Sequence, residues 1–145
     1  MRYWLLKSEP SVWSWDDQCA AGQAGTVWDG VRNHLAKRHL MAMQRGDRAF
    51  FYHSNEGKAI VGIVEVTEEH RPDPSDASGT FVMVGVRAVA TLARPVTLAH
   101  IRTLASLRDM ALLTSARLSV QPVTSPQWET LVALGGVTPL AGTIG

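Results

Sequence analysis

Apolar residues in this chain come in short blocks that polar, proline or glycine residues interrupt. Blocks of this length that are rich in β-branched and aromatic residues predict β-strands. They lie at residues 3–6, 48–54, 58–66, 80–93 and 117–123. The block "KAIVGIVEV" (58–66) is almost continuously apolar, which is typical of a strand that is buried on both faces or closed into a barrel. Pro10 and Pro122 are expected to end the first and last strands, and Gly85 to mark a bulge or a close approach.

Capping sequences predict the starts of two helices. A serine or threonine followed three positions later by an acidic or amide residue is typical of a helix N-terminus. The two pairs are Ser14 with Asp17 and Thr124 with Gln127. The first helix is expected to end near Gly22 and the second at Gly135, and a further helix is expected after Thr97.

Residues 33–43 predict an amphipathic helix with a basic side. Leu35, His39 or Leu40, and Met43 recur near helical spacing, while the cationic residues fall on another face. Residues 32–48 hold five basic residues and one acidic residue, and residues 65–76 hold five acidic residues and one basic residue. Solvated faces and a small basic patch beside a pocket both explain such runs, and charge alone does not choose between them.

Composition indicates one globular domain. The 145 residues are 46% hydrophobic and 19% charged, and the net charge of +1 lacks the excess typical of a non-specific nucleic-acid binder. The acidic stretch 68–79 is expected to be a surface loop, and residues 138–145 a loosely ordered tail after a domain at 1–137. The single cysteine, Cys19, and the lack of an apolar run of about 20 residues favour a cytoplasmic protein without a membrane partner.

Few residues are spaced for catalysis or for cofactors. The five histidines form no i, i+4 pair or His-carboxylate cluster, and no glycine-rich phosphate loop occurs, so we expect no metal and no cofactor. A serine such as Ser8, Ser54 or Ser119 meeting His53 in space stays open as a minority interpretation, because catalytic triads are defined by geometry.

The tryptophans are the more informative residues. Trp4, Trp128 and at least one of Trp13 and Trp15 are expected in the core. Trp28 stands in "TVWDGVRN", an irregular polar segment before the basic helix, where its ring can form the wall of a pocket for a flat ligand.

Three polar segments follow or overlap strands: "KSEP", "YHSN" and "SVQP". If the strands close as a barrel, these strand ends converge near Trp28. The residues brought there are Lys7, Ser8, Tyr52, His53, Ser54, Ser119 and Gln121. For any one of them alone, an ordinary loop residue is the simpler explanation.

Together, "YWLLKSEPSVWSWDD", "WDGVRNHLAKRHLMAMQRGDRAFFYHSN", "GIVEV" and "RLSVQPVTSPQWETL" resemble the EVE domain family in order and spacing over residues 2–135. The resemblance implies an α+β, PUA-like fold, a small mixed β-barrel with flanking short helices, related to the YTH and ASCH domains. It also implies binding of modified bases in DNA, such as modified cytosines, or in RNA.

The resemblance carries specific residues onto this chain. Trp28 matches a cage tryptophan, and the matching motif residues are Lys7, Ser8, Glu9, Gly30, Arg32, Asn33, Tyr52, His53, Ser54, Ser119 and Gln121. Ser8 is expected at the pocket mouth, able to bond a base edge. This chain departs from the family at "FVMVGV" (81–86), where many members have a tryptophan and an aspartate, and the preceding loop is shorter.

Three functions follow as hypotheses. The first, which we favour, is a non-catalytic module that binds a modified base of DNA or RNA beside Trp28, with Arg32, Arg38 and Arg45 near phosphates. The second is a small enzyme that acts on a nucleic acid or small molecule in the same pocket through His53, and the third is a protein-interaction domain. A bacterial, monomeric protein is the working expectation, and the base and its modification stay open.

Overall fold

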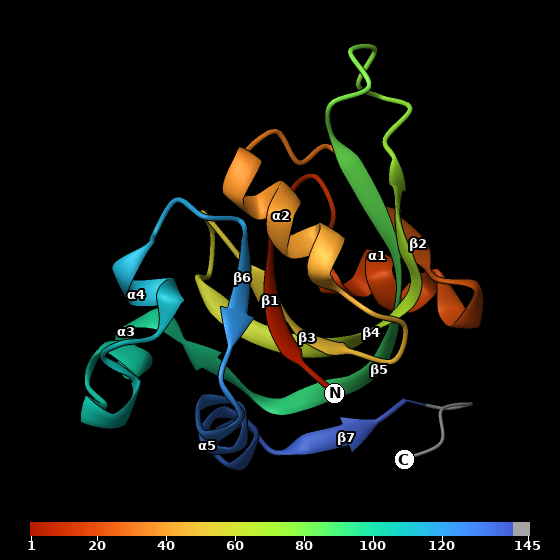
Figure 1. Cartoon of the computed structure of the whole chain (residues 1–145). Helices are drawn as coiled ribbons and strands as arrows, with labels where there is room; N and C mark the ends of the chain where they lie inside the picture. Colours follow the sequence, from red (N-terminus) through yellow and green to blue (C-terminus); the bar gives the residue numbers. More distant parts are fainter. Residues whose placement is uncertain (141–145) are drawn as a thin grey trace.

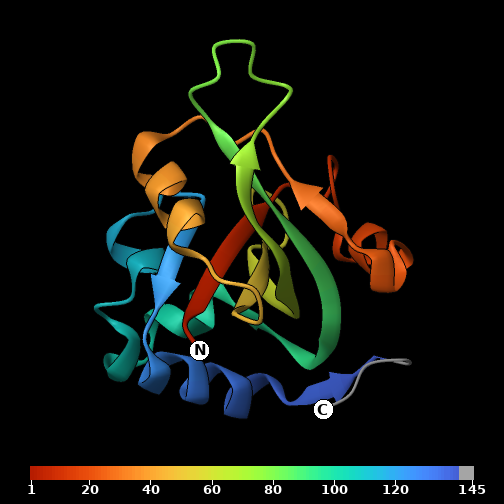
Figure 2. The same cartoon turned by 45° about the vertical axis from the view of Figure 1, so that its right-hand side comes forward.

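A strongly bent sheet with short helices on both sides makes up the molecule (Figures 1 and 2). This computed structural model describes residues 1–140. The strands are β1 (Tyr3–Ser8), β2 (Thr26–Trp28), β3 (Arg48–His53), β4 (Ala59–Pro72), β5 (Val82–Thr97), β6 (Val120–Val123) and β7 (Val137–Pro139). The helices are α1 (Trp15–Ala20), α2 (His34–Ala42), α3 (Leu98–Arg102), α4 (Ala111–Thr114) and α5 (Ser125–Gly135), with 3-10 turns η1 (Gly22–Ala24) and η2 (Ala105–Leu107).

The sheet order is β2-β5-β4-β3-β1-β6, with β7 added beside β5. β1 and β3 run parallel, and the other pairs are antiparallel. Helix α2 contacts β4, β5 and β6, so it covers the side that the two sheet edges leave open. The α+β class and the small mixed barrel with flanking helices are therefore confirmed. The ends of β1 and β3 and the start of β6 meet at one end of this barrel.

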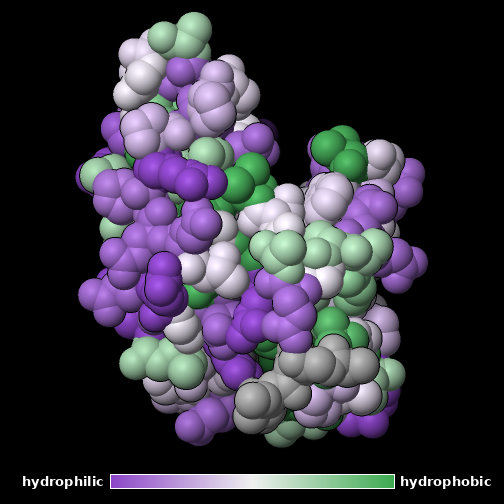
Figure 3. Space-filling view, turned by 90° about the vertical axis from the view of Figure 1, so that its right-hand side faces the viewer, coloured by the Kyte–Doolittle hydropathy of each residue, from purple (hydrophilic) through white to green (hydrophobic). Residues whose placement is uncertain are grey.

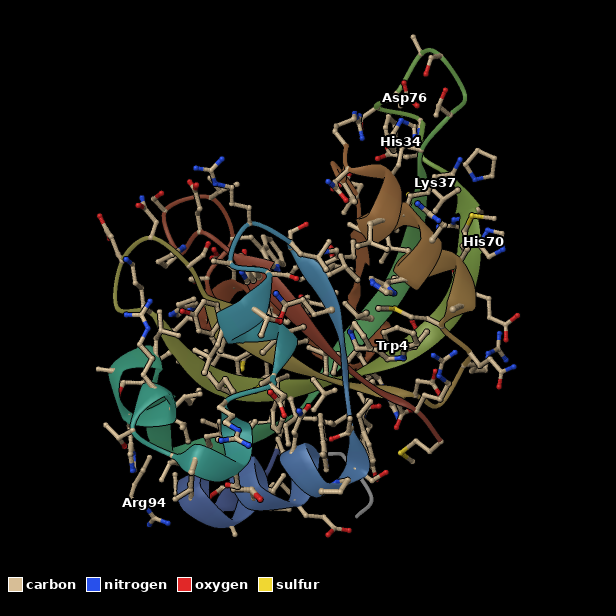
Figure 4. All side chains as sticks on the ribbon, turned by 60° about the vertical axis from the view of Figure 1, so that its left-hand side comes forward. Trp4, His34, Lys37, His70, Asp76 and Arg94 are labelled. Carbon is tan, nitrogen blue, oxygen red and sulfur yellow. The ribbon has the colours of Figure 1, made fainter. Side chains whose placement is uncertain are left out.

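Two apolar cores lie on the two faces of the sheet. Trp4, Leu6 and Phe51 belong to the core beneath α2, whereas Leu5 and Phe50 point to the core that α3 and α5 cover. Successive residues of a strand face opposite sides, so a strand with apolar residues at every position needs two covered faces. Figure 4 shows Trp4 beneath α2 in the middle of the molecule.

The predicted helix starts are confirmed by their caps. The Ser14–Asp17 and Thr124–Gln127 pairs both form complete capping boxes, at α1 and α5. Thr97 caps α3 by accepting a hydrogen bond from the amide of His100. In α2, Leu40 and Met43 are buried as expected, but Leu35 faces solvent with 43% of its surface exposed.

The predicted surface loop at 68–79 is wrong for its first part, because β4 continues to Pro72. Arg71 and Pro72 pair with Met83 and Val82, so backbone hydrogen bonds hold a segment with almost no apolar surface to bury. We name residues 67–81 the hairpin arm; it stands out from the barrel in Figures 1 and 2. Gly85 lies opposite Glu68 at an irregularity in the pairing, and a Cβ there would lie 2.8 Å from the Thr67 hydroxyl, which confirms the close approach.

Two further boundaries differ from the prediction. Pro122 does not end β6 but lies inside it, which is tolerated because β6 is the sheet edge and needs no amide donor on its outer side. Thr138 and Pro139, assigned to a loose tail, pair with Thr91 and Ala90 of β5. Residues 141–145 lie outside the described residues.

Within residues 1–140, no helix has both the length and the apolar character needed to cross a bilayer. Nor does this part of the chain bring three or more potential metal-ligating side chains together.

Candidate functional site

A pocket of about 510 Å³ opens at the end of the barrel where β1 stops. Four segments line it: the end of β1, the turn that follows β1, the chain from β2 to the start of α2, and the residue before β6. The lining residues are Lys7, Ser8, Glu9, Val12, Trp13, Thr26, Val27, Trp28, Asp29, Gly30, Val31, Arg32 and Ser119. Figure 3 shows the face of the molecule hollowed beside the hairpin arm, which rises at the upper left.

Two tryptophans provide the aromatic wall of the pocket. Trp28 does line it, but in strand β2 and not in an irregular segment; it is 8% exposed, and its ring stands edge-on to Phe51 at 5.6 Å. Trp13 is half-buried, and its indole Nε1 donates to Gln18 Oε1 at 2.8 Å. The sequence did not predict Trp13 as a pocket residue. The spacing of Trp13 and Trp15 indicates that one of them is buried in the core, but it does not indicate whether the other faces solvent or a pocket.

Lys7, Ser8 and Ser119 form the polar wall. Lys7 Nζ donates to the carbonyl of Ala116 at 2.5 Å, and partial burial lowers the pKa of its ammonium group. Ser8 Oγ donates to the carbonyl of Trp13 at 2.5 Å. Because that bond uses the hydroxyl proton, Ser8 can offer a ligand only an acceptor. The polar end of β1 thus stays at the pocket, and it also fixes the turn that carries Trp13.

The rim opposite β1 is attached to the hairpin arm by Asp73. This residue is only 1% exposed. Its Oδ2 accepts hydrogen bonds from the amide of Gly30 at 2.9 Å and from Arg32 Nη1 at 3.1 Å. Its Oδ1 accepts hydrogen bonds from the amide and the hydroxyl of Ser75. Burial by itself raises the pKa of Asp73, but the hydrogen bonds from Ser75, Gly30 and Arg32 hold it well below its usual range. Gly30 has φ +76°, a left-handed conformation that favours glycine.

Arg32 was expected to face phosphates, and the structure shows that much of its guanidinium is already engaged. Nη2 donates to Ser75 Oγ at 2.9 Å, and the guanidinium carbon lies 5.6 Å from the Phe81 ring centroid. With 40% of its side chain exposed, Arg32 both lines the pocket and joins it to the arm.

Five of the predicted base-binding residues do not line the pocket, and three of them have other roles in the fold. Tyr52 is buried in the second core, and Asn33 caps α2 by accepting a hydrogen bond from the amide of Ala36. Gln121 is fully buried, and its Nε2 donates to the carbonyls of Ala111, Leu118 and Ser115. The convergence expected at Trp28 fails for Tyr52, His53, Ser54 and Gln121, none of which lines the pocket. The side chains of Tyr52 and Gln121 are buried elsewhere.

His53 and Ser54 lie behind the pocket lining. His53 Nε2 accepts a hydrogen bond from the amide of Trp15 at 3.0 Å, so this nitrogen is deprotonated, and burial lowers the pKa of the imidazole. Ser54 donates its backbone amide to the carbonyl of Ser8. Within residues 1–140, no serine hydroxyl is hydrogen-bonded to His53, the contact that the serine-histidine hypothesis requires.

Exposed cations occur on α2, just after it, and in the loop before β6. Arg45 precedes β3, whose first residue pairs with the start of β1, so it does not lie at the end of β1 that opens into the pocket. Arg38 on α2 and Arg45 just after it are exposed, and neither forms an ion pair within residues 1–140. Arg117, which sequence reasoning did not single out, is also exposed and follows Ala116, the residue bonded by Lys7. Figure 4 shows His34 and Lys37 of α2 at the base of the arm, with Asp76 at its tip.

Comparisons with known proteins agree with this architecture. The EVE domain profile matches residues 2–134. The chain is 35% identical to thymocyte nuclear protein 1 of Rattus norvegicus, over 94% of this chain and 75% of the rat protein. Among solved structures, Rpa0253 of Rhodopseudomonas palustris is 60% identical over 94% of both chains, with a TM-score of 0.89.

A third relative was solved with a ligand. Human THYN1 in complex with DNA that contains 5-methylcytosine is 32% identical to this chain, with a TM-score of 0.86, over 96% of this chain and 100% of the human one. These matches confirm the resemblance seen in the "KSEP", "WDGVRN" and "SVQP" motifs, and with it the PUA-like fold. The chain is a member of the EVE domain family.

Proposed function

We propose that this protein is a non-catalytic nucleic-acid-binding module that takes a single modified base into the pocket between Trp13 and Trp28. The observation that carries the proposal is the pocket itself, whose 510 Å³ and two tryptophans suit a planar ring. Human THYN1, which has the same fold and was solved with DNA containing 5-methylcytosine, supports a modified cytosine as the first candidate.

In this proposal the aromatic wall and the polar wall of the pocket contact different parts of the base. Stacking on an indole contributes ~1–3 kcal/mol per base and tolerates any base. The Lys7 ammonium and the Ser119 hydroxyl donate hydrogen bonds to the base edge, and Ser8 accepts one. A methyl group on the base adds about 0.8 kcal/mol of binding free energy if it is buried, so methylation changes the affinity only modestly. The hydrogen bonds to the base edge determine which base is bound.

The exposed arginines bind the backbone in this scheme. Arg38, Arg45 and Arg117 approach phosphates, while Arg32 contributes in part because Asp73 and Ser75 hold it. Neutralising about three phosphates makes the affinity fall with salt at a logarithmic slope of about −2 to −3.

The experiment is an anisotropy titration against short DNA and RNA strands that carry one modified or one unmodified base. Trp13→Ala should weaken binding of the preferred strand by roughly 5- to 150-fold, the range of one stacking contact. Trp28→Phe keeps an aromatic ring against Phe51 and should weaken it less. Trp128→Phe is the matched control, because Trp128 stacks on Phe50 at 4.0 Å, outside the pocket lining. Equal losses in Trp13→Ala and Trp128→Phe would contradict the proposal.

The same variants separate the other two functions. An enzyme would convert its ligand, and His53→Ala would stop conversion without stopping binding. A protein-interaction domain would keep its partner in Trp13→Ala, because its binding surface lies outside the pocket.

A cytoplasmic location and a bacterial source belong to the proposal as well. The 60% identity to Rpa0253 of Rhodopseudomonas palustris, against 32% to human THYN1, supports the bacterial source. Fractionation of cells that express the native protein tests the location.

A further inference from the structure

One apolar side chain of the pocket lining is largely exposed to solvent. Val12 lines the pocket and is 76% exposed, the largest exposed fraction among the large apolar side chains of residues 1–140. Val27, on β2, also lines the pocket and is 37% exposed. The Trp13–Trp28 pocket therefore has an apolar lip formed by two different segments of the chain.

Val12 is carried by a turn that the structure holds rigidly. The amides of Val12 and Trp13 both donate to the carbonyl of Glu9 at 2.9 Å, and Pro10 restricts the backbone inside the turn. The bond from Ser8 Oγ to the carbonyl of Trp13 closes the turn from the other side. The turn therefore holds the exposed valine in a fixed position. A side chain that only faces solvent does not need a fixed position.

Exposure by itself assigns no role, because single apolar side chains are common on protein surfaces. Leu35 and Met41 are exposed on α2 and Val137 on β7, and none of them lines the pocket. Val12 differs from them in lying beside the opening through which a base must enter.

We propose that the ligand of this pocket is a base in a duplex, and that Val12 enters the base stack at the place that the extruded base leaves. The inference rests on the proposed function and deepens it. A base drawn out of a duplex leaves a gap between its neighbours, and nucleic-acid-binding proteins fill such gaps with apolar wedges. A single strand has no such gap, since its bases unstack at little cost, so an apolar wedge on the pocket lip is useful only for a duplex.

The test compares one modified strand in two forms. The probe is a short DNA carrying a single 5-methylcytosine, used unpaired and as a duplex with its complement, and a second duplex carries 2-aminopurine next to the modified base. The variants are Val12→Ala, Val12→Leu and, as a matched control, Val137→Ala. These side chains are exposed, so the variants are expected to fold, and thermal unfolding checks this.

Val12→Ala should weaken binding of the duplex about ten-fold and binding of the single strand much less, because only the duplex uses the wedge in addition to the pocket lining. Val12→Leu should keep duplex binding, Val137→Ala should change neither form, and the 2-aminopurine signal on binding should fall in Val12→Ala. Equal weakening of both forms, or no change in either, overturns the wedge. Wild-type protein that binds the single strand but not the duplex overturns the duplex as the ligand and leaves the base-binding function standing. Failure of wild type to bind either form overturns 5-methylcytosine as the ligand, and with it the wedge at a 5-methylcytosine site.

Discussion

Replacing Asp73 with asparagine tests whether the hairpin arm positions the pocket rim. Each carboxylate oxygen accepts two hydrogen bonds: Oδ1 from the amide and hydroxyl of Ser75, and Oδ2 from Gly30 and Arg32. An asparagine keeps the size of the side chain but turns one oxygen into an NH₂ group. Whichever oxygen is replaced, two donors lose their acceptor and face another donor.

The cost follows from burial and charge. The Asp73 side chain has no exposed surface, and a hydrogen bond to a charged group contributes about 1.5–3 kcal/mol. Arg32 and Ser75 regain water when released, because both are exposed, so the loss is smaller than two full bonds. Asp73→Asn should therefore lower the free energy of unfolding by about 2–4 kcal/mol. It should also weaken base binding, since Gly30 and Arg32 lose their common anchor.

Urea unfolding across pH gives the second readout. The pKa of Asp73 lies below that of an unfolded aspartate, about 3.9, so its contribution is complete above that pH and declines as the pH falls further. The difference in stability between wild type and Asp73→Asn should be constant from pH 7 to about 5 and shrink below about 4.

Asp76→Asn is the matched control. Asp76 accepts hydrogen bonds from Ser78, Thr80 and Phe81 at the arm tip, and these hold its pKa to about 2, but no hydrogen bond links it to Gly30 or Arg32. The Asp76→Asn variant should therefore bind the base with unchanged affinity. The reasoning fails if Asp76→Asn weakens binding as much as Asp73→Asn, or if Asp73→Asn alters neither stability nor its pH dependence.

Two other predictions concern the core behind the pocket. Gly62→Ala should lower the free energy of unfolding, measured in urea, by about 1–3 kcal/mol, because the new Cβ would collide with the Trp15 ring. A hydrogen bond to Thr91 fixes that ring. Wild-type stability in this variant would show that the ring can move. His53 has a lowered pKa, so the unfolded chain takes up its proton first and stability falls as the pH drops below about 6.5. His53→Gln should reduce this loss of stability between pH 7 and 5.5. An unaltered pH dependence would show that another group causes the loss.

Local features of this protein were readable from the sequence because their physical cause is local. A capping box needs only a serine or threonine and its partner three residues later, and both boxes formed at α1 and α5. Runs such as "KAIVGIVEV" predicted strands covered on both faces. The motif around Trp28 contains residues that line one side of the pocket.

The tertiary structure decided which polar and aromatic groups share a site. Trp13 faces the pocket because Gln18 and Ser8 hold its turn. Gln121 lies outside the pocket because its amide donates to three carbonyls of α4 and the loop that follows it. The acidic segment became a paired arm because strand pairing with β5 satisfied a backbone whose side chains have little to bury. The sequence determined each element and its buried face through neighbours a few residues away, whereas the direction of each polar side chain depended on partners brought together only by folding.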